Sequence, residues 1–153
     1  MSFTATARQL GGTLCHEVDV NGRHTIITDE PATLGGSDLG PAPHELLPAT
    51  LASCIATMVS LYAHNKGWAL EGVSVDVVYD SESLPRRFEV VLRLPDGLAP
   101  EQVERLRRVA ETCPVRRALE AGFTFEERVE LGPRPDAAPV RVADTGVAQS
   151  SAA

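Results

Sequence analysis

Short apolar runs that contain β-branched residues alternate with polar breaks at the start of the chain. Such runs are typical of short strands. The dipeptide Asn21-Gly22 lies between the second and third runs and strongly favours a hairpin turn. The pattern therefore predicts three strands, at Phe3–Arg8, Leu14–Val20 and His24–Asp29.

A glycine- and proline-rich connection, residues 31–43, precedes the longest helical pattern in the chain. From Leu47 to Tyr62, apolar residues recur at spacings of three and four, which predicts an amphipathic helix. Gly67 closes this pattern. Pro43 fits the first turn, whereas Pro48 marks either the start of the helix or a kink in it.

Apolar residues also occupy much of the remaining circumference of this central helix. They are Leu46, Ala49, Ala52, Ala56 and Ala63. A helix that is apolar most of the way round must be covered on several sides. One small sheet is not enough for this, so we expect the chain to form a homodimer.

The second half of the chain returns to strands and then to helices. The predicted elements are strands at 73–78 and 87–94, helices at 99–112 and 114–121, and a final strand at Phe123–Leu131. The order β-β-β-α-β-β-α-α-β has no regular βα alternation and predicts an α+β fold with antiparallel sheets. From Gly132 onward large apolar residues are scarce, so residues 1–132 are predicted to form the domain and 133–153 a disordered tail.

Charge and composition narrow the classes of partner. The formal net charge of -7 argues against nucleic acid or an anionic membrane surface as the main partner. The apolar runs are too short for a membrane-spanning helix, and the first residues do not resemble a signal peptide, which predicts a cytoplasmic protein. The histidines and cysteines lack metal-ligand spacing, and no phosphate-binding glycine motif is present, so we expect neither metal nor cofactor.

Three cysteines are the candidates for chemistry. Cys54 lies on the apolar stripe of the central helix, where it is either a core residue or a functional thiol. Cys113 precedes Pro114 at a predicted helix N-terminus, where backbone N–H groups favour a thiolate or use the residue as a cap. Local sequence thus makes Cys113 the more acidic of the two. Cys15, in a predicted strand, is interpreted as structural.

Several arginines lie among glutamates on the predicted helix at 99–112. They are Arg105, Arg107 and Arg108, interspersed with Glu101, Glu104 and Glu111. This charge pattern is typical of a solvated face held by salt bridges.

The run LGGSDLGPAPHELLPATLASC at Leu34–Cys54, its continuation IATMVSLYAHNKGWALEGVSV and the later ETCPVRRAL at Glu111–Leu119 resemble the OsmC/Ohr family. The likeness covers about residues 10–131 and is greatest to the OsmC-like branch with a CPV motif at the second cysteine. The resemblance implies an intertwined homodimer with long central helices between sheets. It also implies thiol-dependent reduction of organic hydroperoxides in defence against oxidative stress.

Carried over residue by residue, the resemblance makes Cys54 the thiol that attacks the peroxide and Cys113 the thiol that resolves the sulfenic acid as a disulfide. The family uses an arginine from the N-terminal strands, held by a glutamate near the start of the central helix. In this chain the expected stretch, around Thr13–His16, has no arginine, and Arg23 on the Asn21-Gly22 turn is the nearest candidate. Glu45 stands nine residues before Cys54, and His44 occupies the position ten before it.

The resemblance implies that Cys54 is the more acidic of the two thiols, which reverses the ranking from local sequence. Both inferences hold if an arginine contributed by the dimer lowers the pKa of Cys54 in an apolar pocket. We expect that pocket, lined by Leu51, Met58 and Tyr62, to favour small apolar hydroperoxides. An external dithiol is expected to be the reductant.

Two other functions are compatible with the same residues. The first is a non-catalytic dimer that binds small apolar ligands or senses oxidants slowly. The second is a purely structural protein whose cysteines only fill the core. Peroxide turnover separates the predicted enzyme from both, and ligand binding separates the two from each other.

Overall fold

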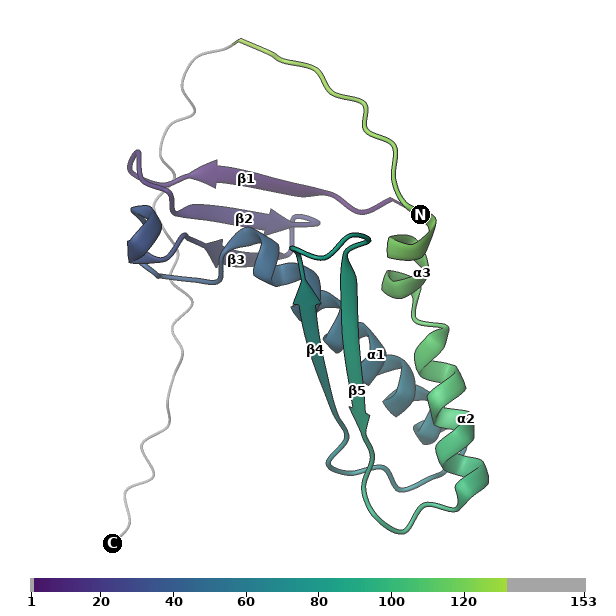
Figure 1. Cartoon of the computed structure of the whole chain (residues 1–153). Coiled ribbons are helices and arrows are strands. Elements are labelled where there is room, and N and C mark those ends of the chain that lie inside the picture. The colour runs from purple at the N-terminus through teal and green to yellow at the C-terminus, as the bar shows by residue number, and fades with distance from the viewer. Residues whose placement is uncertain (1, 132–153) are drawn as a thin grey trace, which may run out of the picture. The chain divides into compact units, whose positions relative to one another are not determined.

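The structure, a computed structural model, describes residues 2–131. It divides into two units, one built from the residues up to Gly40 and the other from Pro41–Val129 (Figure 1). The fold is α+β, with antiparallel sheets and one long helix, as predicted. The predicted tail, 133–153, lies outside the described residues, and the extent of the domain stays a prediction.

The first unit contains a three-stranded antiparallel sheet. Its strands are β1 (Ala5–Gln9), β2 (His16–Val20) and β3 (His24–Thr28), in the order β1-β2-β3. Val20 pairs with His24 across the predicted turn. Asn21 and Gly22 have φ values of 55° and 65°, which these two residue types tolerate best. The three strands and the hairpin predicted from sequence are therefore confirmed.

A single buried carboxylate holds the loop that follows β3. Asp29 is 1% exposed and accepts hydrogen bonds from the N–H groups of Glu30, Ser37 and Leu39 at 2.8, 3.0 and 3.2 Å. Between these contacts the chain forms one turn of 3-10 helix, η1 (Ala32–Leu34). The loop thus has a defined conformation despite its glycines and prolines.

We expect the contribution of Asp29 to stability to disappear in acid. Burial raises the pKa of this carboxyl, but the N–H groups of Leu39, Ser37 and Glu30 outweigh burial and hold the pKa below its ordinary value of 3.8. The positive charge of His16 acts in the same direction. A carboxyl whose pKa is lowered by folding stabilises the folded state at pH values above its ordinary pKa. This stabilisation is lost as the pH falls through the lowered pKa of the folded protein.

The measurement is the melting temperature of the wild type and of Asp29→Asn as a function of pH. The wild type should melt higher at neutral pH, and the gap should close below pH 3.8, where the protonated carboxyl resembles the amide. A gap that is constant with pH would contradict the role given to the charge.

The second unit is organised around one long helix. One 3-10 turn, η2 (Pro43–Glu45), leads directly into α1 (Leu46–Asn65). Pro48 is the third residue of α1, where a backbone N–H has no partner within the helix. It therefore costs no hydrogen bond, and of the two alternatives predicted for it, a position at the helix start is the one observed.

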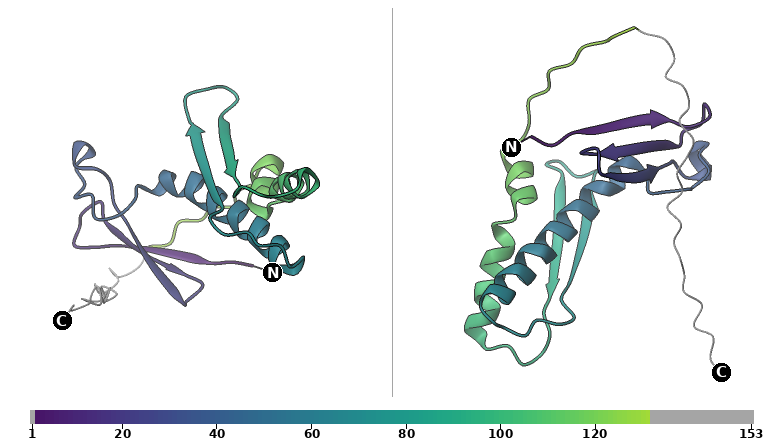
Figure 2. Two further views of the ribbon diagram at one scale, coloured as in Figure 1. Left: turned by 90° about the horizontal axis from the view of Figure 1, so that it is seen from below. Right: turned by 180° about the vertical axis from the view of Figure 1, so that it is seen from behind.

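Two strands and two further helices complete this unit. They are β4 (Ser74–Asp80) and β5 (Arg87–Arg93), which form an antiparallel pair, and α2 (Pro100–Glu111) and α3 (Pro114–Ala121). Figure 2 shows α1 running alongside the β4–β5 pair and α2. The predictions of these strands and helices are confirmed.

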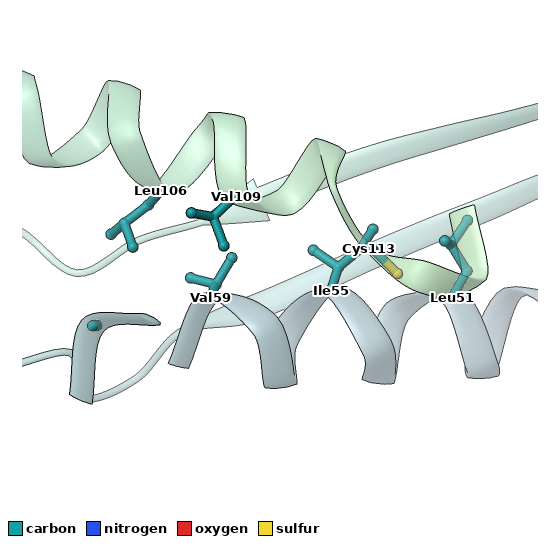
Figure 3. Packing of buried hydrophobic residues seen from close by; sticks show 7 residues of the cluster. Leu51, Ile55, Val59, Leu106, Val109 and Cys113 are labelled. Carbon is teal, nitrogen blue, oxygen red and sulfur yellow. The ribbon is translucent and has the colours of Figure 1, made fainter. Parts of the chain in front are cut away.

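The core of the second unit lies between these helices and the β4–β5 pair. One stripe of α1 at four-residue spacing supplies half of it, and α2 with the start of α3 supplies the rest (Figure 3). The members of the core are Leu51, Ile55, Val59, Ala63, Leu106, Val109 and Cys113. The predicted candidate Cys113 is therefore a core residue.

The final strand predicted at Phe123–Leu131 is absent. These residues are exposed, and neither sheet of residues 2–131 includes them. Phe123, Phe125, Val129 and Leu131 do occupy alternate positions, a pattern typical of a strand. Alternation alone does not make a strand, because a strand needs a neighbour to accept and donate its backbone hydrogen bonds.

By length and mean hydropathy alone, Pro43–Asn65 meets the criteria for a membrane-spanning helix, as core helices of globular proteins also do. The mean hydropathy of this segment is high although Thr50, Ser53, Thr57 and Ser60 keep each apolar run short. In this structure the helix packs one stripe of side chains into the core, which is the pattern of a core helix in a globular unit.

Candidate functional site

Two of the predicted site residues, Cys54 and Cys113, come from distant parts of the sequence and lie together. Cys54 is half-buried on α1, and Cys113 is the N-cap of α3 and 0% exposed. The N-cap position was predicted from Pro114. Figure 3 shows Cys113 beside Ile55 of α1. The two thiols are close enough for Cys113 to affect the pKa of Cys54.

The surroundings of Cys54 within the second unit disfavour its thiolate. Burial raises the pKa of the Cys54 thiol above its ordinary value, and its hydrogen bond with Cys113 raises the pKa further. The N–H of Val115, in the first turn of α3, opposes this and lowers it. No arginine is among these groups. Thus an arginine that activates Cys54 has to come from outside this set of neighbours.

Glu45 and Arg23, the two predicted partners of Cys54, lie in different parts of the structure. The Glu45 carboxylate turns back and accepts a hydrogen bond from the N–H of Ala42 at 2.9 Å, and it is not among the groups that set the Cys54 pKa. Nine residues of α-helix make about two and a half turns, which puts Glu45 on the far side of α1. Arg23 lies on the turn between β2 and β3, in the first unit, and its role stays a prediction.

A groove of about 370 Å³ runs along α1 one turn beyond Cys54. From α1 it is lined by Met58, Leu61, Tyr62 and Asn65. Met58 and Tyr62, two of the residues predicted for a pocket around Cys54, line this groove, but Cys54 itself does not. Leu51 does not, since its side chain is 2% exposed and packs in the core.

The arginines of α2 do not all belong to a solvated, salt-bridged face. Arg107 and Arg108 follow the prediction, because both pair with Glu104 and Arg107 also pairs with Glu111. Arg105 instead donates from Nε to the hydroxyl of Tyr62 at 2.8 Å. The sequence carried a signal for this, since Arg105, Val109 and Thr112 share one face of α2 at spacings of four and three.

Cys15 lies in the first unit and is buried next to Asp29. Burial raises the pKa of its thiol, and the charge of Asp29 raises it further. Cys15 therefore has little thiolate at neutral pH. Within residues 2–131 no group of three or more histidine, cysteine, aspartate or glutamate side chains could hold a metal ion.

Comparison with protein families gives one match. The family model described as OsmC-like protein matches residues 35–128, which include both Cys54 and Cys113 and every residue of the groove. No curated protein matches the chain.

Solved structures with the same fold come from several bacteria. An osmotic stress induced and detoxification response protein from Psychrobacter arcticus is 25% identical, with a TM-score of 0.64 over 76% of this chain and 87% of that one. An organic hydroperoxide resistance protein, OsmC, from Legionella pneumophila is also 25% identical, with a TM-score of 0.52 over 78% and 89%. An OsmC-like protein from Mycoplasma pneumoniae, 17% identical, matches with a TM-score of 0.60 over 78% and 88% and shows the fold alone.

Proposed function

The chain belongs to the OsmC-like protein family, and from this premise we propose that it is a thiol peroxidase that reduces organic hydroperoxides in defence against oxidative stress. The observation that carries the proposal is the proximity of two thiols, because Cys113 belongs to the apolar core and Cys54 packs against that core close enough for Cys113 to affect its pKa. The similarity to the Legionella organic hydroperoxide resistance protein supports the same activity.

The proposed reaction uses the two thiols in sequence. The Cys54 thiolate attacks the outer oxygen of the hydroperoxide, the O–O bond breaks, and the alkoxide takes a proton to leave as an alcohol. Cys54 is then a sulfenic acid. The Cys113 thiol attacks that sulfur, a disulfide forms and water leaves. An external dithiol reduces the disulfide and returns both thiols.

Apolar surroundings favour an organic substrate over hydrogen peroxide. Cys54 and Met58 lie one turn apart on α1, and the groove continues from Met58 to Tyr62. Apolar groups of a bound hydroperoxide would leave water there, which contributes about 25 cal/mol for each Å² buried. Hydrogen peroxide has no such group.

A homodimer completes the proposed enzyme. Leu47 and Leu61 of α1 are exposed in the single chain, and Leu61 is 52% exposed. A second copy packed on this helix would cover them, as the apolar circumference of α1 requires. The dimer would also bring Arg23 to Cys54, where its positive charge would lower the thiol pKa.

The role of Arg23 is testable through the pH profile of Cys54 alkylation. Arg23→Gln should move the midpoint of this profile upward by about one unit, because the thiolate loses a neighbouring positive charge. Arg8→Gln, on β1, is the matched control and should leave the midpoint in place. Peptide mass mapping isolates Cys54 from the other thiols. Equal shifts in both variants would point to net charge instead of a specific contact.

The test of the proposed function is the reaction of reduced protein with a small excess of an organic hydroperoxide. Rapid loss of two thiols per chain, with a Cys54–Cys113 disulfide in the peptide map, is expected. Slow oxidation scattered over all three cysteines would overturn the proposal.

A second candidate function rests on the raised pKa of Cys54. It is a non-catalytic dimer that binds small apolar ligands in the groove or senses oxidants slowly. Ligand binding without peroxide turnover, in both the wild type and Cys113→Ser, would favour this function.

A further inference from the structure

The turn between β2 and β3 carries an arginine that has no partner of its own. Arg23 follows Asn21-Gly22 and precedes His24, where β3 begins to pair with β2. Arg23 is exposed, and within residues 2–131 its side chain forms neither a salt bridge nor a hydrogen bond. Because a guanidinium is always charged in proteins, the turn presents one positive charge without a paired carboxylate.

The carboxylate of Asp19, on β2, holds the backbone of this turn. Its Oδ1 accepts a hydrogen bond from the N–H of Gly22 at 2.8 Å. Asp19 forms no salt bridge within residues 2–131, with Arg23 or with any other cation. The acidic side chain closest to Arg23 in the β2–β3 hairpin thus fixes the shape of the turn and leaves the guanidinium unpaired.

Asn21 ties the same turn to the start of the sheet. Its backbone N–H donates to the carbonyl oxygen of Thr4 at 2.9 Å. Its side-chain Oδ1 accepts from the N–H of Thr4, also at 2.9 Å. Thr4 directly precedes β1, so the turn is anchored to β1 as well as to its own strand β2.

These two side-chain anchors exceed what the turn itself needs. Asn-Gly is the dipeptide that most favours a hairpin turn, and the N–H of Arg23 already closes this one on the carbonyl oxygen of Val20 at 3.2 Å. Further contacts restrict the direction in which the tip of the hairpin points. Such support is what a charged group on a turn requires to act on a reacting atom at a fixed place.

We propose that Asp19 and Asn21 are positioning residues, which hold the β2–β3 turn so that Arg23 reaches Cys54 of a second copy of the chain. This inference rests on the proposed function, in which the dimer brings Arg23 to Cys54. Asp19 and Asn21 touch neither thiol, and they act only through the arginine.

The pH profile of Cys54 alkylation tests this role. Reduced full-length protein is treated with iodoacetamide over a series of pH values, and peptide mass mapping follows Cys54 alone. Asp19→Ala and Asn21→Gly each remove one anchor, and glycine still allows the left-handed backbone of the turn. Each should raise the midpoint by about half a pH unit, less than Arg23→Gln does, because the positive charge remains but is held less closely.

The direction of the shift separates positioning from a direct effect of charge. A negative charge near a thiol disfavours the thiolate, so loss of the Asp19 charge by itself would lower the midpoint. Asp19→Asn keeps an oxygen that can accept from the N–H of Gly22, and this variant should not raise the midpoint. Glu17→Ala, on the same strand, is the matched control for loss of a charge away from the turn and should not raise it either.

In an Arg23→Gln background, loss of either anchor should cause no further rise, since the anchors act through Arg23. A rise that persists in this background would overturn the proposal. So would unchanged midpoints in both Asp19→Ala and Asn21→Gly, or the absence of any rise in Arg23→Gln, which would leave no charge to position. Melting curves establish that each variant folds, and because the two anchors differ, failure of one variant to fold leaves the other to decide.

Consumption of an organic hydroperoxide separates this inference from the proposed function. The expected shifts without any peroxide turnover in the wild type would retain the positioning role and reject the peroxidase. Turnover in the wild type, with midpoints unchanged by loss of either anchor, would reject the positioning role and retain the peroxidase.

Discussion

Replacing Cys54 by serine is expected to abolish the reduction of organic hydroperoxides, with a loss of about a thousandfold or more, as when other enzymes lose their nucleophile. A serine hydroxyl at this half-buried position cannot form the sulfenic acid on which the cycle depends. Peroxide consumption in the presence of a small dithiol is the measurement. The substitution is nearly isosteric, so the melting temperature should change little.

Cys113→Ser should block a later step of the proposed cycle, the conversion of the sulfenic acid to a disulfide. Cys54 should still react with one equivalent of peroxide, but its sulfenic acid should persist and be trapped by dimedone. Cys15→Ser is the matched control, since Cys15 is buried in the other unit and takes no part in the cycle. Equal turnover by Cys54→Ser and the wild type would refute the assignment, as would a dimedone adduct on Cys113.

Gly36→Ala should destabilise the first unit strongly. An added Cβ would lie 1.7 Å from the carbonyl oxygen of Glu30, which is backbone and cannot rotate away. The loop would have to move and give up the N–H contacts of Ser37 and Leu39 with Asp29. We expect a cost of about 3 kcal/mol or more, seen as a fall of about 10 °C in melting temperature.

Gly35→Ala is the matched control for this loop. Gly35 has a φ of 89°, so alanine is strained there by roughly 1 kcal/mol, but the nearest atom to an added Cβ is a Leu14 side-chain carbon at 3.9 Å. The same physical argument predicts a large effect for Gly40→Ala, whose Cβ would lie 2.3 Å from the carbonyl oxygen of Ile27. A similar fall in melting temperature in Gly35→Ala and Gly36→Ala would contradict the steric explanation.

Local signals in the sequence were sufficient for most elements. Three of them depend only on neighbouring residues and could therefore be predicted. They are the Asn21-Gly22 hairpin, the helix after Pro43 and the N-cap at Cys113. The strand expected from Phe123 was wrong because pairing depends on a neighbour that alternation does not supply.

The candidate site could not be predicted from local sequence, because it depends on contacts between distant segments of the chain. Family resemblance made Cys54 and Cys113 the candidate pair, but neither composition nor spacing showed that the two thiols lie close enough for one to affect the pKa of the other. Arg105 was interpreted as one of several solvated arginines, because helical spacing to Glu101 and Glu104 is visible in the sequence and the approach of Tyr62 is not. The direction in which Glu45 turns also depends on Ala42 and the 3-10 geometry before α1.

The loop held by Asp29 has a consequence for protein engineering. Its conformation depends on one carboxylate and on two glycines, Gly36 and Gly40, that pass close to backbone carbonyls. The η1 turn between these points has no buried side chain. A peptide epitope or an affinity tag could therefore replace Ala32–Leu34, with Asp29 and both glycines retained as the frame that closes the graft.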